Sequence, residues 1–240
     1  MSFLKIMKGV IISAGLGTRL RPITNIISKN LLPVYNKPLI YYSIETMKKA
    51  GVDEILIVVN KRDIGQYKLI LGNGEEFDIP ISYAIQQEQK GTAHAVLCSE
   101  EFADGGSIAV IFADNLFEDD FNFSDFNGGA RIHIKEVPDP ERSGVVEIKD
   151  EKIISLEEKP KFPKSNYIMC GLYLYDNNVF DFIRTLKPSA RGELESPDLL
   201  SIYLKMGKLD YKIVNGFWND AGTFDSMLEA GNMIKKKFSK

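Results

Sequence analysis

The chain of 240 residues has few of the side chains that build disulfide frameworks and zinc sites. Its two cysteines, Cys98 and Cys170, both lie in largely apolar stretches, a pattern typical of buried free thiols. Its two histidines, His94 and His133, have no second histidine or cysteine at ligand spacing. The sequence therefore argues against a disulfide and against a zinc site.

Long hydrophobic runs and an excess of positive charge are also missing. No apolar run reaches the roughly 18 residues that a membrane-spanning helix requires, and the N-terminus lacks the pattern of a signal peptide. We therefore expect a cytoplasmic protein with no membrane partner. Because 30 Lys and Arg stand against 33 Asp and Glu, the formal net charge is −3. A slightly acidic chain does not offer a generally basic surface for nucleic acid.

The first half of the chain alternates short β-branched runs with helical patterns. We predict strands over 9–13, 54–59, 79–85 and 107–112, and helices over 38–50, 63–71 and 92–102. This alternation is typical of a parallel sheet with helices on both faces. Because such sheets bind ligands beyond the carboxyl ends of their strands, we expect the site at that edge.

The rhythm changes after about residue 130. Four strands are predicted over 131–137, 144–148, 152–156 and 167–175, with helices over 177–185 and 196–206 and no helix over 121–129. A last helix after Thr223 is expected to place Phe224, Met227, Leu228 and Ile234 on one side. The predicted fold is α/β: a Rossmann-like mixed, mainly parallel sheet flanked by helices, in a single domain over 1–240.

A glycine-rich segment with concentrated positive charge follows the first strand. Gly15 and Gly17 allow backbone N–H groups to approach an anion, and Arg19, Arg21 and Lys29 add three cations. The alternative is an ordinary turn with solvated side chains. The segment does not match a P-loop or a dinucleotide fingerprint, because no Gly-Lys-Ser/Thr follows it and no helix opens directly after its glycines.

Isolated carboxylates are the other candidates for chemistry. Asp114, at the end of an apolar strand, could hold Mg²⁺ or merely cap a turn, and Asp220 is ambiguous in the same way. Glu157 and Glu158 are adjacent on a strand, so at most one of them faces the crevice. We expect His94 to be a packing or polar-surface residue. Cations, glycines and single carboxylates suit phosphate chemistry by positioning and charge neutralisation.

Together, these features resemble the sugar-1-phosphate nucleotidyltransferase family, most nearly its glucose-1-phosphate thymidylyltransferases. The resemblance runs from Met7 to about Lys235 and is carried first by four motifs: Gly17-Thr-Arg-Leu20, Ser28-Lys29 before Leu31-Leu-Pro33, Asp114-Asn115 and Glu158-Lys159-Pro160. It also includes Pro138-Asp-Pro-Glu-Arg142, Gly144-Val-Val-Glu147, Lys187-Pro-Ser-Ala-Arg-Gly-Glu-Leu-Glu195 and Trp218-Asn-Asp-Ala-Gly222. It implies the nucleotide-diphospho-sugar transferase fold, with a nucleotide-binding half over about 7–130 and a sugar-binding half over about 131–240. The implied reaction is Mg²⁺-dependent transfer of a nucleotidyl group from dTTP to α-D-glucose 1-phosphate by a homo-oligomeric enzyme.

The resemblance also implies roles for individual residues. The catalytic cations would be Arg19, Lys29 and Lys159, and the metal ligands Asp114 and Asp220. The nucleotide would be bound by Ala14, Gly15, Gly17, Thr18, Arg19, Lys29, Gln86 and Gly91. The sugar phosphate would be bound by Asn115, Gly144, Glu158, Lys159 and Gly171.

Two departures from the family pattern leave alternatives open. The loop over 14–17 is one residue shorter than is usual in the thymidylyltransferases and has the form seen in bacterial UTP–glucose-1-phosphate uridylyltransferases. An enzyme that uses UTP, accepts both nucleotides or takes another hexose 1-phosphate is therefore the second interpretation, although Arg191-Gly-Glu-Leu-Glu195 is similar to the thymidylyltransferase version. A non-catalytic nucleotide-sugar-binding subunit is a remote third. Since the chain stops at Lys240, we expect no regulatory site built from extra C-terminal helices.

Overall fold

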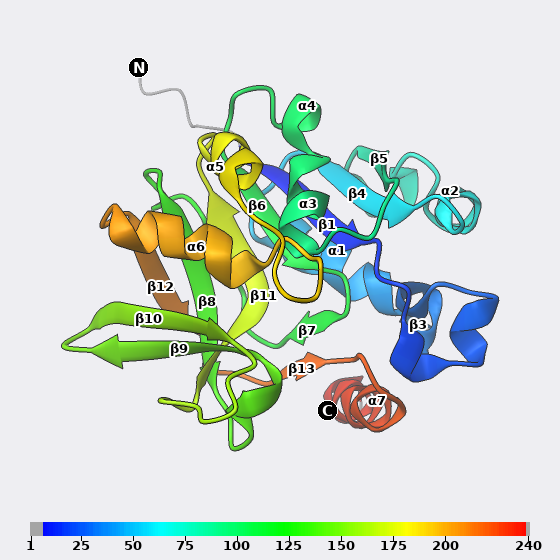
Figure 1. The fold of residues 1–240 in the computed structure, drawn as a ribbon. Coiled ribbons are helices and arrows are strands. Elements are labelled where there is room, and N and C mark those ends of the chain that lie inside the picture. The colour runs from blue at the N-terminus through cyan, green and yellow to red at the C-terminus, as the bar shows by residue number, and fades with distance from the viewer. Residues whose placement is uncertain (1–6, 239–240) are drawn as a thin grey trace.

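A computed structural model of the chain describes residues 7–238. Its centre is a nine-stranded sheet that continues from the N-terminal half into the C-terminal half (Figure 1). Seven strands follow the order β10-β9-β11-β6-β1-β4-β5, β8 pairs with β11, and β12 pairs with β8. The mixed sheet flanked by helices is the predicted fold class.

Four strands form the parallel part of the sheet: β1 (Lys8–Ser13), β4 (Ile55–Asn60), β5 (Ile81–Gln86) and β6 (Ile108–Phe112). β1 lies between β4 and β6 and is parallel to both. Neighbouring residues of β1 face opposite sides: Val10 packs in one core cluster and Ile11 in the other. Both faces of β1, β4 and β6 are covered, which explains their nearly continuous apolar sequences, whereas β5 lies at the edge of the sheet and has an exposed Ser82.

The other five strands of this sheet come from the second half of the chain. They are β8 (Ala130–Glu136), β9 (Gly144–Lys149), β10 (Lys152–Glu158), β11 (Tyr167–Tyr175) and β12 (Leu209–Ile213). β11 joins the two parts, because it pairs antiparallel with β6 and also with β8 and β9. The predicted change of rhythm near residue 130 is therefore a change from parallel to mainly antiparallel pairing.

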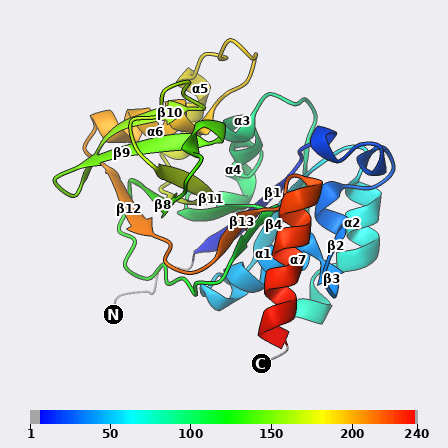
Figure 2. The same ribbon diagram turned by 90° about the horizontal axis from the view of Figure 1, so that it is seen from below.

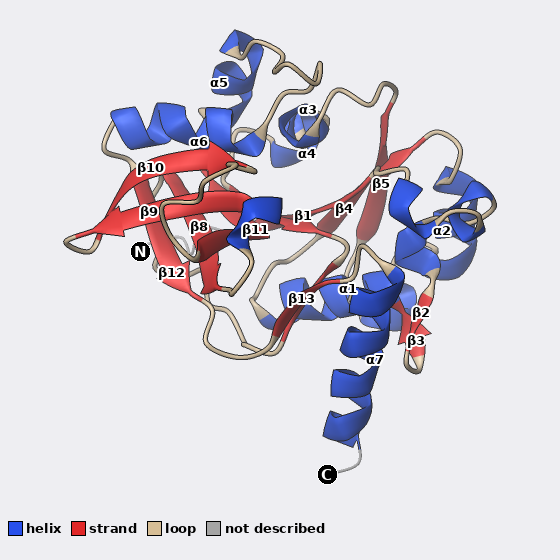
Figure 3. Cartoon of the chain, turned by 60° about the horizontal axis from the view of Figure 1, so that its bottom comes forward, coloured by secondary structure: helices blue, strands red, loops and turns tan. Residues whose placement is uncertain are grey.

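Helices cover both faces of the sheet (Figure 3). One face carries α3 (Thr92–Leu97), α4 (Glu100–Ala103), α5 (Val179–Thr185) and α6 (Ser196–Lys205). The opposite face carries α1 (Leu39–Lys49) and α2 (Ile64–Leu71). Short 3₁₀ turns lie at Thr18–Leu20, Ile23–Asn25, Lys29–Leu31, Glu75–Phe77 and Pro140–Arg142. No helix among residues 7–238 is long and apolar enough to cross a membrane.

Two small sheets lie beside the main one. β13 (Trp218–Asp220) pairs with β7 (Asn115–Phe117), and β2 (Pro33–Val34) pairs with β3 (Lys37–Pro38). The last helix, α7 (Phe224–Phe238), follows β13 and stands at the edge of the molecule (Figure 2). None of these short strands, nor β12, was predicted: β7, β12 and β13 each depend on a partner that is distant in sequence, and β2 and β3 are only two residues long.

One helix prediction is wrong in detail. The helix expected over 92–102 is two helices, broken at Cys98 and Ser99, where the Ser99 hydroxyl donates to the Val96 carbonyl oxygen at 2.6 Å and competes with the helical pattern. On α7, Phe224 and Leu228 are exposed, and the buried residues are Ala230 and Ile234. The absence of a helix over 121–129 and the free, partly or fully buried cysteines agree with the predictions.

Candidate active site

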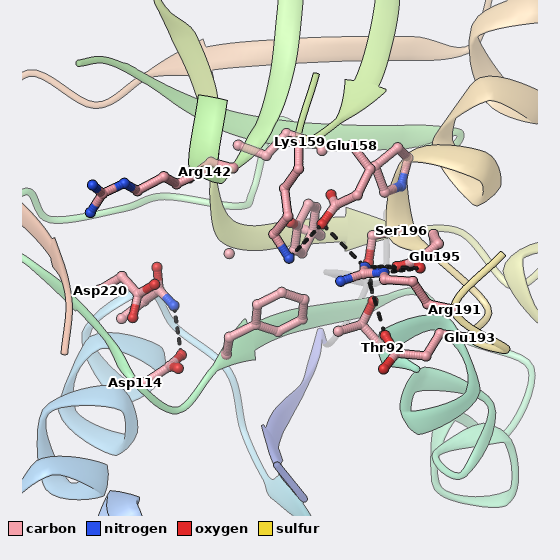
Figure 4. A pocket seen from close by; sticks show the side chains of 18 of the residues that line it. Thr92, Asp114, Arg142, Glu158, Lys159, Arg191, Glu193, Glu195, Ser196 and Asp220 are labelled. Carbon is pink, nitrogen blue, oxygen red and sulfur yellow. Dashed lines mark hydrogen bonds and ion pairs between the residues drawn. The ribbon is translucent and has the colours of Figure 1, made fainter. Parts of the chain in front are cut away.

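A cavity of about 510 Å³ opens at the carboxyl end of β6 and β1, between the two halves of the chain (Figure 4). It is lined by Arg19, Thr92, Phe112, Asp114, Asn115, Arg142, Ser143, Gly144, Glu158, Lys159, Met169, Gly171, Tyr173, Arg191, Glu193, Glu195, Ser196, Pro197, Trp218 and Asp220. Most of these side chains are polar or charged, as a site for a phosphorylated sugar requires.

The fold brings Asp114 and Asp220 into this cavity from distant parts of the chain. Asp114 follows β6, and β13 pairs with β7 so that Asp220 lies opposite Asn115. The backbone N–H of Ala221 donates to the Asp114 carbonyl oxygen at 2.9 Å, which ties the two segments together. The sequence identified each aspartate as a candidate on its own. The pairing of β13 with β7 shows that the two lie close together.

The surroundings shift the pKa values of the two carboxyl groups in opposite directions. Burial favours the neutral form of Asp114, but the charge of Lys29 and its hydrogen bond outweigh burial and lower the pKa of this carboxyl. Burial and then the negative charge of Asp114 raise the pKa of Asp220. The positive charges of Lys29 and of Arg19, whose guanidinium nitrogen lies 3.8 Å from the Asp220 carboxylate, oppose this rise without reversing it.

These carboxylates fit a magnesium ion held together with phosphate oxygens. Asp220 Oδ1 is buried and accepts no hydrogen bond within residues 7–238, so it is free to ligate a cation. No group of three or more His, Cys, Asp or Glu side chains in that part of the chain could hold a metal alone. Mg²⁺ usually takes one or two protein carboxylates and completes its shell with water and substrate phosphates.

Asn115 and Trp218 fix the orientation of Asp114. The Trp218 indole N–H donates to Asn115 Oδ1 at 2.8 Å, and the Asn115 amide nitrogen donates to Asp114 Oδ1 at 2.8 Å. Gly171 makes room for this arrangement, because a Cβ atom there would lie 2.9 Å from the Asn115 amide. Trp218 therefore holds Asn115 in place, and Asn115 in turn holds the carboxylate of Asp114.

The glycine loop leads from β1 to Arg19 at the cavity. Ala14 is buried, Gly15 and Thr18 are exposed, and Gly17 adopts a left-handed conformation with φ of 63°. A Cβ atom at Gly17 would approach Thr24 at 3.0 Å and Lys29 at 3.2 Å. Glycine is therefore required both by the turn and by the close approach of the segment that carries Lys29.

A buried polar network holds the segment around Lys29. The Tyr67 hydroxyl, on α2, hydrogen-bonds with the hydroxyls of Ser13 at 2.5 Å and Ser28 at 2.6 Å. The Asn30 amide nitrogen donates to Ser13 Oγ at 2.6 Å. Because Ser28 and Asn30 flank Lys29, the network fixes the backbone from which Lys29 reaches Asp114. Tyr67 was not predicted to support the site, because nothing in the sequence around it indicates that its hydroxyl bonds to Ser13 and Ser28.

Gln86 and Gly91 do not line the cavity, although Thr92, which follows Gly91, does. The Gln86 amide nitrogen donates to the Gly91 carbonyl oxygen at 3.0 Å and lies 3.0 Å from His94 Nδ1. The Gly91 loop is in turn held by the segment 193–195, because the Leu194 N–H donates to the Lys90 carbonyl oxygen at 2.8 Å. His94 is half-buried and polar, as expected, but it also contacts a predicted site residue.

The opposite wall of the cavity carries Glu158 and Lys159. Glu158 lines the cavity and Glu157 is exposed, as the strand alternation required. Lys159 Nζ lies 3.1 Å from Glu158 Oε1. Gly144 lies under Glu158, and a Cβ atom at this position would be 3.3 Å from Glu158 Oε2 and would collide with Met169.

Two cavity cations were missed as site residues. Arg191 belongs to the Arg191–Glu195 motif and donates to both carboxylate oxygens of Glu195 at 2.9 Å. It also lies 3.5 Å from Glu158. Arg142 is an exposed residue of the turn Pro140–Arg142 and lines the cavity, where its side chain points away from Lys159 and Glu158 (Figure 4). Both motifs carried the family resemblance, which was the available signal, but neither arginine was given a role.

Comparisons with known proteins agree over nearly the whole chain. A family model described as nucleotidyl transferase matches residues 8–237. A glucose-1-phosphate thymidylyltransferase of Neisseria meningitidis is 42% identical over 239 residues, which cover 95% of this chain and 83% of that protein. One of Mycolicibacterium smegmatis is 42% identical over 238 residues, with 95% and 82% covered.

Two solved structures have the same fold. A Bacillus anthracis protein, assigned as a glucose-1-phosphate thymidylyltransferase and crystallised with sucrose, matches with a TM-score of 0.90 and 43% identity, over 95% of this chain and 94% of that one. A UDP-glucose pyrophosphorylase complexed with UDP-glucose matches with a TM-score of 0.85 and 27% identity, over 97% of this chain and 99% of that one.

Proposed function

The chain belongs to the nucleotidyl transferase family, and we propose that it transfers a thymidylyl group from dTTP to α-D-glucose 1-phosphate. The products are dTDP-glucose and pyrophosphate. The thymidylyltransferase relatives at 42% identity over 95% of the chain support this choice of substrates.

One observation carries the proposal: two carboxylates from distant segments meet in a cavity whose other walls carry cations. Asp114 contacts Lys29, Asp220 lies near Arg19, and Lys159 faces them from the sugar-binding half. Such a site suits a substrate pair with several phosphate charges and one divalent cation.

The reaction needs little beyond positioning. A phosphate oxygen of the sugar phosphate attacks the α-phosphorus of dTTP, an O–P bond forms, and the bond to the β-phosphate breaks with its electron pair leaving on pyrophosphate. The nucleophile is already ionised, so no general base is required. The obstacle is repulsion: two unit charges about 4 Å apart cost about 4 kcal/mol at an effective dielectric of 20.

Arg19 and Lys29 would offset that repulsion on the triphosphate side and stabilise the departing pyrophosphate. Lys159 would do so for the sugar phosphate, with Glu158, Asn115 and the backbone around Gly144 and Gly171 orienting the sugar. Asp114 and Asp220 would hold Mg²⁺, which when bound neutralises phosphate charge. The glycine loop over 14–18, with Gln86 and Gly91, would bind the nucleotide.

A UTP-using or dual-specificity enzyme is the second candidate. Two observations favour it: the short loop over 14–17 and the similarity to a UDP-glucose pyrophosphorylase at a TM-score of 0.85. Thymine and uracil differ by one methyl group, worth about 1–3 kcal/mol in a pocket. The resemblance further predicts a single-domain, homo-oligomeric, cytoplasmic enzyme, which sedimentation and cell fractionation would test.

The test is pyrophosphate release with Mg²⁺, glucose 1-phosphate and each of dTTP, UTP, CTP, ATP and GTP. We expect dTTP to be preferred, and Asp114→Asn to lower turnover about 1,000-fold because a metal ligand is lost. Asp181→Asn, a surface carboxylate on α5, is the matched control and should keep full activity. Equal use of UTP would move the assignment to the second candidate. Full activity of Asp114→Asn would contradict the metal site, and no release with any nucleotide would contradict the function.

A further inference from the structure

We propose that His94 is a positioning residue that sets base specificity, because it locks the Gln86 amide so that only its oxygen is offered to the nucleotide. This inference rests on the proposed nucleotide site at the rim of the cavity. It would select a base that carries a ring N–H, such as thymine or uracil, over cytosine, whose corresponding nitrogen is an acceptor.

The chemistry of the contacts determines the amide orientation. The carbonyl oxygen of Gly91 can only accept a hydrogen bond, so the Gln86 atom 3.0 Å away must be the amide nitrogen. That nitrogen has a second hydrogen, which points to His94 Nδ1 at 3.0 Å. Nδ1 must therefore accept, and the ring must be neutral with its hydrogen on Nε2.

The electrostatic surroundings of the ring agree with a neutral histidine. Burial and then the charge of Lys90 lower the pKa of His94, and the charge of Glu88 opposes them. At neutral pH the ring keeps its lone pair on Nδ1 available to Gln86.

Both partners of the amide are held in place. His94 lies in α3, and Gly91 is clamped against the segment 193–195, where a Cβ atom would lie 2.5 Å from the Leu194 carbonyl oxygen. The Ala93 N–H donates to that same oxygen at 3.1 Å. With both amide hydrogens engaged, Gln86 cannot rotate without losing two hydrogen bonds.

The remaining polar group of the Gln86 side chain is its amide oxygen, Oε1. Gln86 is almost fully buried, with 3% of the residue exposed, and its hydrogen bonds with Gly91 and His94 both use the amide nitrogen and leave Oε1 out. Gln86 ends β5, which is separated from β1 and its glycine loop by β4 alone. The spacing of two strands is about 10 Å, so a base seated between the loop and Gln86 would present its edge to this oxygen.

The test compares two substitutions of similar shape. His94→Asn places an acceptor oxygen close to the position of Nδ1, and His94→Leu has the same branching with no acceptor. The probes are dUTP and dCTP, which differ only at the base edge. The readouts are kcat/KM for pyrophosphate release with glucose 1-phosphate and binding of each nucleotide by calorimetry without sugar phosphate.

We expect His94→Leu to lower the preference for dUTP over dCTP about tenfold, the effect of one hydrogen bond, in both readouts. His94→Asn should keep the preference within about threefold of wild type. If His94→Leu does not fold, as judged by thermal unfolding, His94→Phe carries the same prediction because it keeps a ring without nitrogen.

Other outcomes overturn the proposal. An unchanged preference in the variants without an acceptor would show that His94 does not control the amide. An equal loss in His94→Asn would show that packing, not hydrogen bonding, matters. A wild type that binds dUTP no better than dCTP would overturn it as well. Absence of turnover with intact binding preference would contradict the proposed reaction and leave the role of His94 supported.

Discussion

Lys29 and Lys159 both bring an ammonium group to the crevice, but the two halves of the chain hold them differently. The Lys29 side chain is 13% exposed, contacts Asp114 and is flanked by the buried network of Ser13, Ser28 and Tyr67. The Lys159 side chain is 49% exposed, and its neighbour there is Glu158. One cation is fixed by the core, and the other is held by an ion pair at the surface.

The difference has a mechanistic meaning. On the proposed nucleotide side, the chain has already ordered the groups that would meet phosphate, so little conformational entropy would be lost on binding. On the proposed sugar side, Glu158 contacts both Lys159 and Arg191, and the three charges partly neutralise one another. Under the proposed roles, a sugar phosphate would have to replace these contacts, and this half would be the more adaptable part of the site.

Replacing the exposed cation should separate the two halves most clearly. We expect Lys159→Gln to raise the KM for glucose 1-phosphate about 30-fold, because charge-assisted hydrogen bonds contribute about 1.5–3 kcal/mol, and to leave the KM for dTTP nearly unchanged. Steady-state kinetics with each substrate varied would measure this. Lys161→Gln, an exposed lysine two residues further, is the control. An equal rise in the KM for dTTP would mean that Lys159 serves the triphosphate instead.

Removing the Tyr67 hydroxyl should weaken the ordered side. We expect Tyr67→Phe to lower kcat/KM for dTTP about tenfold, since the Lys29 segment loses its anchor, with the KM for glucose 1-phosphate unchanged. The free energy of unfolding should fall by about 1–2 kcal/mol. Tyr203→Phe removes another buried hydroxyl, which donates to Asp176 at 2.9 Å in the other half. Tyr203→Phe should lower the free energy of unfolding by a similar amount and keep kcat/KM for dTTP. If it lowered kcat/KM as much as Tyr67→Phe, the effect of Tyr67→Phe would be due to lost stability alone.

The smallest effect concerns the pH dependence of stability. Because the pKa of Asp220 is raised, the native protein holds this proton more tightly than the unfolded chain, and the stabilising contribution is lost as pH rises above the ordinary carboxyl range. Asp220→Asn should therefore become more stable relative to wild type between pH 4 and pH 7. Urea unfolding without metal would show this, and Mg²⁺ with dTTP should then stabilise wild type more than the variant. A difference that does not change with pH would contradict the shift.

Local sequence patterns predicted the parts of the site that depend on one segment. The glycine loop, the place of Asp114 after a buried strand, and the conclusion that at most one of Glu157 and Glu158 faces the crevice all follow from neighbouring residues, while the choice of Glu158 came from the family resemblance. Parallel topology then placed the strand ends at one edge. These features required no knowledge of partners that are distant in sequence.

The parts that were missed depend on tertiary contacts. The pairing of Asp220 with Asn115 joins residues about a hundred positions apart, and the entry of Arg191 into the cavity depends on Glu195 and Glu158. Periodicity identified α7 and placed Phe224, Leu228 and Ile234 on one side, but it did not show that Ile234 is buried while Phe224 and Leu228 are exposed. Helical spacing shows which apolar residues share one side of a helix. It does not show which of them the rest of the protein covers.

The pairing of β13 with β7 also has a consequence for synthesis. A ribosome that has made the first 210 residues has already made the parallel strands, the glycine loop, Lys29 and Asp114, while the second carboxylate arrives only with Asp220. Until then, a nascent chain could fold much of its core and still lack half of the proposed cation site. Incomplete chains of this kind would be ordered but inert, and would not consume nucleotide before the protein is finished.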